Sequence, residues 1–573
     1  MVVRARYGAR PTACFACSPV VLLALLVFNF STLIAQDLSR VDELPPFALS
    51  GSIGASLTSF TTSDSIARRD PLAWTISGAL TPSVYGVQLP LSFIVSSQDQ
   101  SFSQPFNQFG ISPSYGVLTT HFGYRSMRFS RYTLDGATFL GAGAEATPGP
   151  LRLGVMYGRL QRAVEDDSTQ QFVLPAYERS GYAVKIGFGR DGDFFDLSFL
   201  RATDDTNSLS RAPTRANVTP QDNSVLGLAS RFEIIPELSI EADGGASVIT
   251  RDLRAGPLDA ESDIPPYLLG LVTARESTAL LLAMRAAMTL ALTDFSLRLG
   301  YERIEPDFTS LGAYYFATDV ENWTIAPSLA LLEGTLNISG SIGLQHDNLM
   351  NLKLTRTDRL IGSAAVQWRL NDTFGVDLDY TNYASSQSAG LGPINDSIRV
   401  RDVSSSASFA PRVMLPIGEL THSMILVANM QSYRDQNAFT SEFSDNDAMS
   451  LTLLYNIASR QDPLSGGASF MYTDSKSAAS VVNTTGLSLN GSATIADRLS
   501  LGISGGYSST SVEGFPDSST MLSESINAAY RLSDDDGLTL SLYAGQGSSG
   551  GGIPARNELT ATLGYQRSFA WRP

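Results

Sequence analysis

The sequence contains almost no cysteine or histidine. Its 573 residues include two cysteines and three histidines, and both cysteines, Cys14 and Cys17, lie near the N-terminus. A disulfide scaffold needs several paired cysteines, and zinc sites are built mainly from cysteine and histidine. The composition therefore excludes a disulfide-rich fold and predicts no metal site. We also find no motif that predicts a cofactor.

Positive charge is scarce too. Lysine and arginine together number 40 against 56 acidic residues, and the formal net charge is −16. Binding to phosphate backbones requires a basic surface, so we expect no nucleic-acid partner.

Long apolar runs are missing after the first 35 residues. The N-terminus has a basic start, an apolar run over 20–28 and Ala35 before Gln36, which is the three-part pattern of a secretory signal. We expect a cleaved signal peptide over 1–35 and a short periplasmic segment over 36–48, with an uncleaved membrane anchor as the alternative. No later stretch reaches the ~18 apolar residues of a membrane helix.

What the chain has instead is alternation with a period of two. Residues 295–302 are typical: Phe295, Leu297, Leu299 and Tyr301 alternate with serine, arginine, glycine and glutamate. Each such stretch places an apolar face against a polar or small face, as in a half-buried β-strand. We expect an all-β protein.

Two kinds of connection alternate between these strands. Some are tight, as at 190–193, 293–294 and 496–497, and others are long and polar, as at 204–222 and 250–276. Outer-membrane β-barrels have short periplasmic turns and long extracellular loops. This order predicts a transmembrane antiparallel barrel over 49–573; a soluble all-β protein is the alternative.

Aromatic residues support the barrel. The last strand alternates Leu559, Leu563, Tyr565, Phe569 and Trp571 with polar or small residues. Elsewhere, Tyr301, Tyr380 and Tyr507 end outgoing strands, and Trp368 ends a returning one. Aromatic girdles of this kind mark the two membrane interfaces of a barrel.

The size of the barrel depends on residues 98–136. We delimit 25 strand-like segments, whereas a bacterial barrel has an even number, so 98–136 must supply either no strand or two. The total is 24 or 26, and we favour 26, with a backbone diameter of about 50 Å. The chain has no separate plug domain, so we expect 98–136 to fold inward or a partner to fill the lumen.

An arginine repeat in this region is the main candidate site. Arg125, Arg128 and Arg131 recur every third residue, accompanied by Tyr124, Tyr132 and Asp135. Guanidinium groups inside a lumen attract and bind anions. Alternatively, they pair with lumenal carboxylates and only hold the segment. Alternation predicts that the lumen-facing charges include Asp196, Arg298, Glu302, Asp377 and Asp379.

Two further features carry less chemistry. Residues 101–115 contain two prolines and four aromatics, which fits an inward constriction, an aromatic ligand patch or a packed connector. Among the histidines, His346 and His422 adjoin Asp347 and Ser423, but neighbours in a strand point to opposite faces. We expect no catalytic residues and no enzymatic activity.

Five segments between 67 and 167 carry a family resemblance: ARRDP at 67–71, SFSQPFNQFGISP at 101–113, HFGYR at 121–125, TFLGAG at 138–143 and MYGR at 156–159. They resemble large, mostly uncharacterised outer-membrane β-barrel proteins of the Bacteroidota and their relatives. More loosely, a strand followed by an arginine-rich segment and TFLG is similar to the constricting region of substrate-selective porins. The resemblance implies an outer-membrane barrel, with no assigned substrate and no known functional residue.

These observations lead to one functional expectation and one alternative. We expect a porin-like or partner-assisted channel for a solute or polymer, exported to the bacterial outer membrane and embedded in its lipids. The alternative is a barrel without transport activity that serves as a scaffold for a lipoprotein, secretion or surface complex. Either function allows a periplasmic or surface lipoprotein as partner.

Overall fold

The protein is described here by a computed structural model. It describes residues 45–571 except 65–68, 98–103, 167–172, 191, 214–217, 259–269, 315 and 553. The expected signal peptide and residues 36–44 lie outside the described residues. Nearly all regular structure in the described part is β-strand; the helical elements there are a 3-10 turn η2 (Asp396–Ile398) and one turn of helix α3 (Ser441–Ser444). None of the described helices has the length and apolar character needed to span a membrane.

The strands follow one another along the whole chain. They are β1 (Ala48–Thr62), β2 (Leu72–Val84), β3 (Val87–Gln88), β4 (Leu91–Ser96), β5 (Gln108–Ile111), β6 (Ser114–Tyr115), β7 (Leu118–Arg128), β8 (Asp135–Ala146), β9 (Leu151–Gln161), β10 (Arg179–Gly189), β11 (Phe194–Asp204), β12 (Asp222–Ile235), β13 (Leu238–Thr250), β14 (Thr278–Ala291), β15 (Phe295–Ile304), β16 (Val320–Leu331), β17 (Leu336–His346), β18 (Thr355–Arg369), β19 (Phe374–Ala389), β20 (Arg401–Ile417), β21 (Leu420–Asp435), β22 (Asn446–Ser459), β23 (Leu464–Ser477), β24 (Val481–Ile495), β25 (Leu499–Val512), β26 (Ser519–Arg531), β27 (Asp536–Gly547) and β28 (Arg556–Trp571).

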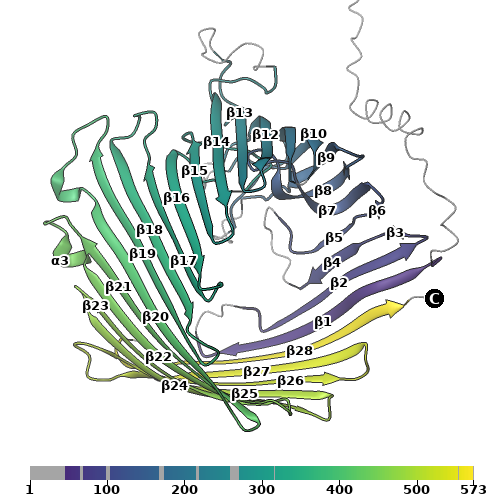
Figure 1. Ribbon diagram of the computed structural model, residues 1–573. Helices are drawn as coiled ribbons and strands as arrows, with labels where there is room; N and C mark the ends of the chain where they lie inside the picture. Colours follow the sequence, from purple (N-terminus) through teal and green to yellow (C-terminus); the bar gives the residue numbers. More distant parts are fainter. Residues whose placement is uncertain are drawn as a thin grey trace, which may run out of the picture.

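These strands form one closed antiparallel barrel (Figure 1). The ring closes where β1 pairs with β28, from Leu49↔Trp571 to Thr62↔Glu558. Pro90 separates β3 from β4, and Pro113 separates β5 from β6, because proline has no N–H for the ladder. Each of these two pairs forms a single wall strand, so 28 − 2 = 26 wall strands make the barrel. The predicted all-β barrel and the favoured number of 26 are confirmed.

The two faces of the wall differ as the alternation predicts. On the outer face of β15, Leu299 stands opposite Met288 of β14 and Ile325 of β16, so three apolar side chains lie side by side. Tyr301 packs against Trp323 at one rim, with ring centroids 4.4 Å apart, and Phe47 packs against Trp571 at the other rim. An apolar outer band between aromatic rims is the surface of a transmembrane β-barrel.

Turn chemistry separates the two rims. At one rim, the short turns include Ala496 and Asp497, whose φ angles of 50° and 55° are both positive. Two successive positive φ values define a tight hairpin turn whose twist matches that of the flanking strands. We call this the short-turn rim. The opposite, long-loop rim carries the connections 251–277 and 305–319.

Residues 98–136 divide between the wall and the lumen. Within this range, β5, β6 and β7 are parts of the wall, so most of the described residues do not fold inward. The inward part that the structure shows is residues 129–134, whose Tyr132 and Leu134 are fully buried. The expected inward segment is therefore too long: a strand that hydrogen-bonds to both neighbours in a barrel cannot also enter the lumen.

Candidate functional site

Two connections from the long-loop rim fold into the barrel and pack against its inner wall. One is residues 129–134, between β7 and β8, and the other is 305–319 without residue 315, between β15 and β16; together we call them the inner loop pair. Phe129 and Leu134 pack into an apolar cluster with residues of β8–β12. Tyr132 and Phe308 pack with residues of β13–β16, with ring centroids 5.7 Å apart. The buried core of this protein therefore lies inside one side of the ring.

Hydrogen bonds fix the inner loop pair to the wall. The Thr133 hydroxyl shares a hydrogen bond of 2.9 Å with Ser198 of β11. From the second loop, the Ser310 hydroxyl donates to the Thr133 carbonyl at 2.5 Å, and the Leu311 amide donates to the Asn223 side chain at 3.0 Å. Because these groups are buried, loss of these hydrogen bonds would be costly.

Glycines in the wall make room for this contact. A Cβ atom on Gly227 would lie 2.4 Å from the Thr133 side chain, and one on Gly245 would lie 2.5 Å from Tyr132 Cβ. Gly300, which also faces the lumen, has no atom within 3.7 Å of such a Cβ atom. The inner loop pair therefore covers the inner wall at β12 and β13 and leaves it exposed at Gly300.

Four of the six predicted site residues come together at the inner loop pair. Arg131 pairs with Glu302 of β15 at 3.2 Å, and Arg128 pairs with Asp135 at 2.9 Å. The Arg128 side chain is 74% exposed, so its charge faces the open lumen. The Tyr132 hydroxyl donates to Glu302 at 3.4 Å, and burial, with the nearby Glu302 charge, raises the pKa of Tyr132 above its usual range.

The other two predicted residues, Arg125 and Tyr124, lie apart from this cluster. Arg125 is on the inner face of β7, where its guanidinium donates to Ser112 Oγ at 2.9 Å and to Ser92 Oγ at 2.7 Å. Tyr124 is on the opposite face, and its hydroxyl accepts a hydrogen bond of 3.4 Å from Arg159. The bulge between Ser126 and Arg128 breaks the spacing of the repeat in space.

The five predicted lumen-facing charges are distributed around the ring. Asp196, which is 3% exposed, pairs with Arg152 at 2.8 Å, and Arg298 bonds to Glu241 at 3.0 Å. Glu302 belongs to the inner loop cluster already described. On β19, Asp377 lies 3.4 Å from Arg412, whereas the exposed Asp379 makes no ion pair with any described residue. Most of these charges are thus neutralised locally.

One series of polar side-chain contacts was not predicted from the sequence. His121 Nδ1 bonds to Ser112 Oγ at 3.0 Å, His121 Nε2 lies 3.5 Å from Glu145, and Lys185 reaches the same carboxylate at 3.5 Å. The residues next to His121 in the sequence are not its partners, which come from neighbouring strands. His121, Glu145 and Lys185 all occupy inward-facing positions of the alternation in β7, β8 and β10. This shared face is the signal that could have identified them from the sequence. The described residues contain no group of three or more His, Cys, Asp or Glu side chains placed to hold a metal ion.

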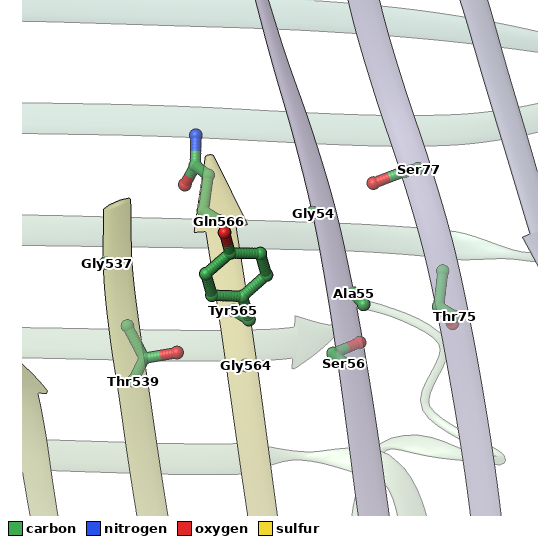
Figure 2. A pocket seen from close by; sticks show the side chains of 10 residues that line it. All are labelled: Gly54, Ala55, Ser56, Thr75, Ser77, Gly537, Thr539, Gly564, Tyr565 and Gln566. Atoms are coloured by element: carbon green, nitrogen blue, oxygen red, sulfur yellow. The ribbon is translucent and has the colours of Figure 1, made fainter. Parts of the chain in front are cut away.

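Over β23, β24 and β25, the inner face is rich in hydroxyl groups. Neighbouring strands there share side-chain hydrogen bonds, including Ser465–Ser492, Ser469–Ser488, Thr484–Thr510 and Ser504–Ser525. The inward positions of β23, β24 and β25 carry no charged residue, and we call this surface the hydroxyl face. Figure 2 shows a shallow pocket farther along, over β27, β28, β1 and β2, lined mostly by glycine, serine and threonine.

No family model and no curated protein matches this sequence. Among solved structures, the chain is similar to OccAB2 of Acinetobacter baumannii, with 10% identity, a TM-score of 0.30, and coverage of 68% of this chain and 98% of that one. It is also similar to OpdQ of Pseudomonas aeruginosa, with 9% identity, a TM-score of 0.34, and coverage of 64% and 97%. A third similar structure is a loop L8 deletion mutant of OmpT, an outer membrane protein of Vibrio cholerae, with 11% identity, a TM-score of 0.25, and coverage of 66% and 100%. At these identities, no residue role transfers from these proteins to this chain.

Proposed function

We propose that this protein is an outer-membrane channel for a polar solute or polymer, narrowed from one side by the inner loop pair. The observation that carries the proposal is the position of this loop pair inside the ring. It places Arg128 and Arg131 toward the lumen, while the hydroxyl face on other strands carries no charge.

The chemistry of the inner wall supports passage of a polar molecule. Hydroxyl and amide groups on the inner face offer both donors and acceptors, which a hydrated or hydrogen-bonding solute can use in turn. The exposed Arg128 adds a local positive field inside a confined passage, where charges are screened less than on an open surface. We propose that this field moderates the cation preference of an otherwise acidic protein.

Location and relatives are part of the proposal. The basic and apolar N-terminus supports export through a cleaved signal peptide, and the short-turn rim would then face the periplasm. The five segments between 67 and 167 support a relationship to the large outer-membrane barrels of the Bacteroidota type. A periplasmic or surface lipoprotein is the partner we propose, because a 26-strand ring leaves room for one.

We propose no enzymatic activity. The Ser112–His121–Glu145 chain has the residue types of a nucleophilic triad, but the Ser112 hydroxyl also accepts a hydrogen bond from Arg125. We interpret this series of side-chain contacts as a support for the barrel wall. Absence of labelling by a fluorophosphonate probe would agree with that interpretation, and labelling that requires Ser112 would contradict it.

Single-channel recording in planar bilayers tests the proposed function. A channel gives discrete conductance steps that scale with salt concentration. The competing scaffold function predicts no steps from the purified chain, together with a stable partner recovered from native membranes. The position of the inner loop pair favours the channel, because a pure scaffold has no need for charges exposed inside its lumen.

A further inference from the structure

Among the described strands, the barrel ladder is shortest beside β5 and β6. Between β5 and β7, only Gly110↔Gly123 and Ile111↔Phe122 are paired, and β6 adds two pairs closer to the short-turn rim. The neighbouring β8–β9 interface has seven pairs, and the ring closure between β1 and β28 has fourteen. Beyond Gly110 and Gly123, toward the long-loop rim, β5 continues to pair with β4 but not with β7.

Side chains hold this split together where the ladder ends. On the inner face, Arg125 of β7 reaches across Gly110 to Ser92 of β4 and Ser112, and a Cβ atom on Gly110 would lie 2.8 Å from its guanidinium carbon. On the outer face, the rings of Phe109 and Tyr124 meet edge to face at 6.2 Å. The split is therefore closed by one polar contact set inside and one aromatic contact outside.

We propose that the split between β5 and β7 is a lateral opening for an amphiphile with an anionic head group, which Arg125 binds while the acyl chain extends outward between Phe109 and Tyr124. This inference goes beyond conduction along the barrel axis and does not depend on it. Separating the wall strand β5–β6 from β7 breaks four ladder pairs, one fewer than the five pairs that join it to β3–β4 on its other side. Backbone groups that are exposed to lipid by such a separation need polar partners, which a polar head group can supply.

The lack of a carboxylate partner for Arg125 among the described residues favours an anionic head group. Arg128 and Arg131 each have a carboxylate partner, whereas Arg125 is bonded to serine hydroxyls and backbone carbonyls and to no carboxylate of the described residues. Its positive charge is thus left for a ligand, and the planar guanidinium fits a carboxylate or phosphate bidentately. Outside the split, Phe109 is 62% exposed and Phe122 is also exposed, so an acyl chain would meet an apolar surface.

A reversible disulfide across the split gives the sharpest test. Phe109 and Tyr124 would be the next ladder pair after Gly110↔Gly123, so F109C/Y124C places two cysteines opposite each other. The sequence has no cysteine after Cys17, so no other thiol competes in the processed chain. The variant is reconstituted in phosphatidylcholine nanodiscs and titrated with NBD-labelled dodecanoate, oxidised and then reduced. We expect oxidation to weaken binding at least tenfold and reduction to restore it.

Matched variants identify the cause of any change. A142C/Y157C forms a disulfide between opposite residues of the fully paired β8–β9 interface, and its oxidation should leave binding unchanged.

The role of Arg125 is tested separately. R125Q should weaken dodecanoate binding at least tenfold, whereas R412Q, on β20, should not. The methyl ester of the probe should bind weakly to wild type and equally to R125Q. Equal binding to oxidised and reduced F109C/Y124C would overturn the lateral opening, and equal binding of acid and ester would overturn the role of Arg125. Channel conductance is recorded on the same samples, so loss of the channel is distinguished from loss of the opening.

Discussion

Arg131 of the first inner loop forms an ion pair of 3.2 Å with Glu302 on the inner face of β15. The same carboxylate accepts a hydrogen bond from the hydroxyl of Tyr132, so a single wall residue holds both an arginine and the fully buried tyrosine of this loop. The two interpretations of the arginine repeat are therefore compatible: the charges that would set the field in the lumen also fix the loop. Experiments on these residues must separate the two effects.

The first prediction concerns ion selectivity. The double variant R128S/R131S removes two positive charges beside the lumen, so reversal potentials in a KCl gradient should shift toward cation preference and unit conductance should rise. R254S serves as the control, because Arg254 pairs with Asp252 in the connection 251–277 and not in the inner loop pair. Thermal stability is measured in parallel. Unchanged selectivity and unchanged stability together would show that these arginines neither narrow the passage nor hold the loop.

The second prediction uses two lumen-facing glycines. G245A should push against Tyr132, whose Cβ would lie 2.5 Å from the new methyl group, and overpacking of this kind costs about 1–3 kcal/mol. G300A should be neutral, because the nearest atom would be 3.7 Å away. Thermal unfolding in detergent should therefore show a lower midpoint for G245A only, with a larger conductance if the loop is displaced. Equal midpoints for the two variants would contradict the close packing of Tyr132 on β13.

A third prediction tests the assignment of faces. L299R places a charge among Met288 and Ile325 on the outer face, where arginine at the bilayer midplane costs ~2–4 kcal/mol. G300R places the same charge in open space on the inner face. Folding yield, measured as the heat-modifiable fraction on a gel, should fall for L299R and stay near wild type for G300R. The reverse order would mean that the inner and outer faces are exchanged.

The fourth prediction is a loss of stability in acid. Asp319, at the end of the second inner loop, is 4% exposed; burial alone would raise the pKa of its carboxyl, but Lys353 and the amides of Leu349 and Asn348 outweigh burial and lower it. A depressed folded-state pKa stabilises the protein above the unfolded value of 3.8, and this contribution is lost as the pH falls below it. The unfolding midpoint of wild type should therefore drop more between pH 5 and pH 3 than that of D319N.

D307N is the matched control for the acid experiment. Asp307 lies in the same loop and pairs with Arg251, but its side chain is 75% exposed, so its ion pair contributes little. The D307N variant should keep the acid dependence of wild type. If D319N and wild type lose stability in parallel between pH 5 and pH 3, the contact between the second inner loop and residues 348–353 is not the acid-sensitive one.

The fold could be read from the sequence because a barrel depends on two local rules. Period-two alternation determines which side chains face lipid, and the alternation of short turns with long loops determines the direction of each strand. Both rules are visible at residues 295–302 and at the Ala496–Asp497 turn. Even the number of strands could be bounded, because both chain ends must lie at the same rim.

The site was less predictable because it depends on register between strands. The sequence shows that Arg125, Arg128 and Arg131 are evenly spaced, but a bulge at Ser126 to Arg128 sends Arg125 to a different neighbourhood. His121, Ser112 and Glu145 meet only because β7 lies between β5 and β8, which no spacing along the chain reveals. The split beside β5 is likewise a property of pairing and leaves no mark in the alternation.

The closure of the ring has a consequence for biogenesis. Every other ladder joins strands that are near one another in the chain, whereas β1 and β28 meet through pairs such as Leu49↔Trp571, and Phe47 packs on that same tryptophan. Hairpins can therefore form one after another at little entropic cost, but the first strand keeps an open edge until the last one has been made. Assembly should thus end in a single slow, all-or-none step. A chain lacking β28 would expose two unpaired strand edges, one on β1 and one on β27, so it would aggregate or bind a chaperone.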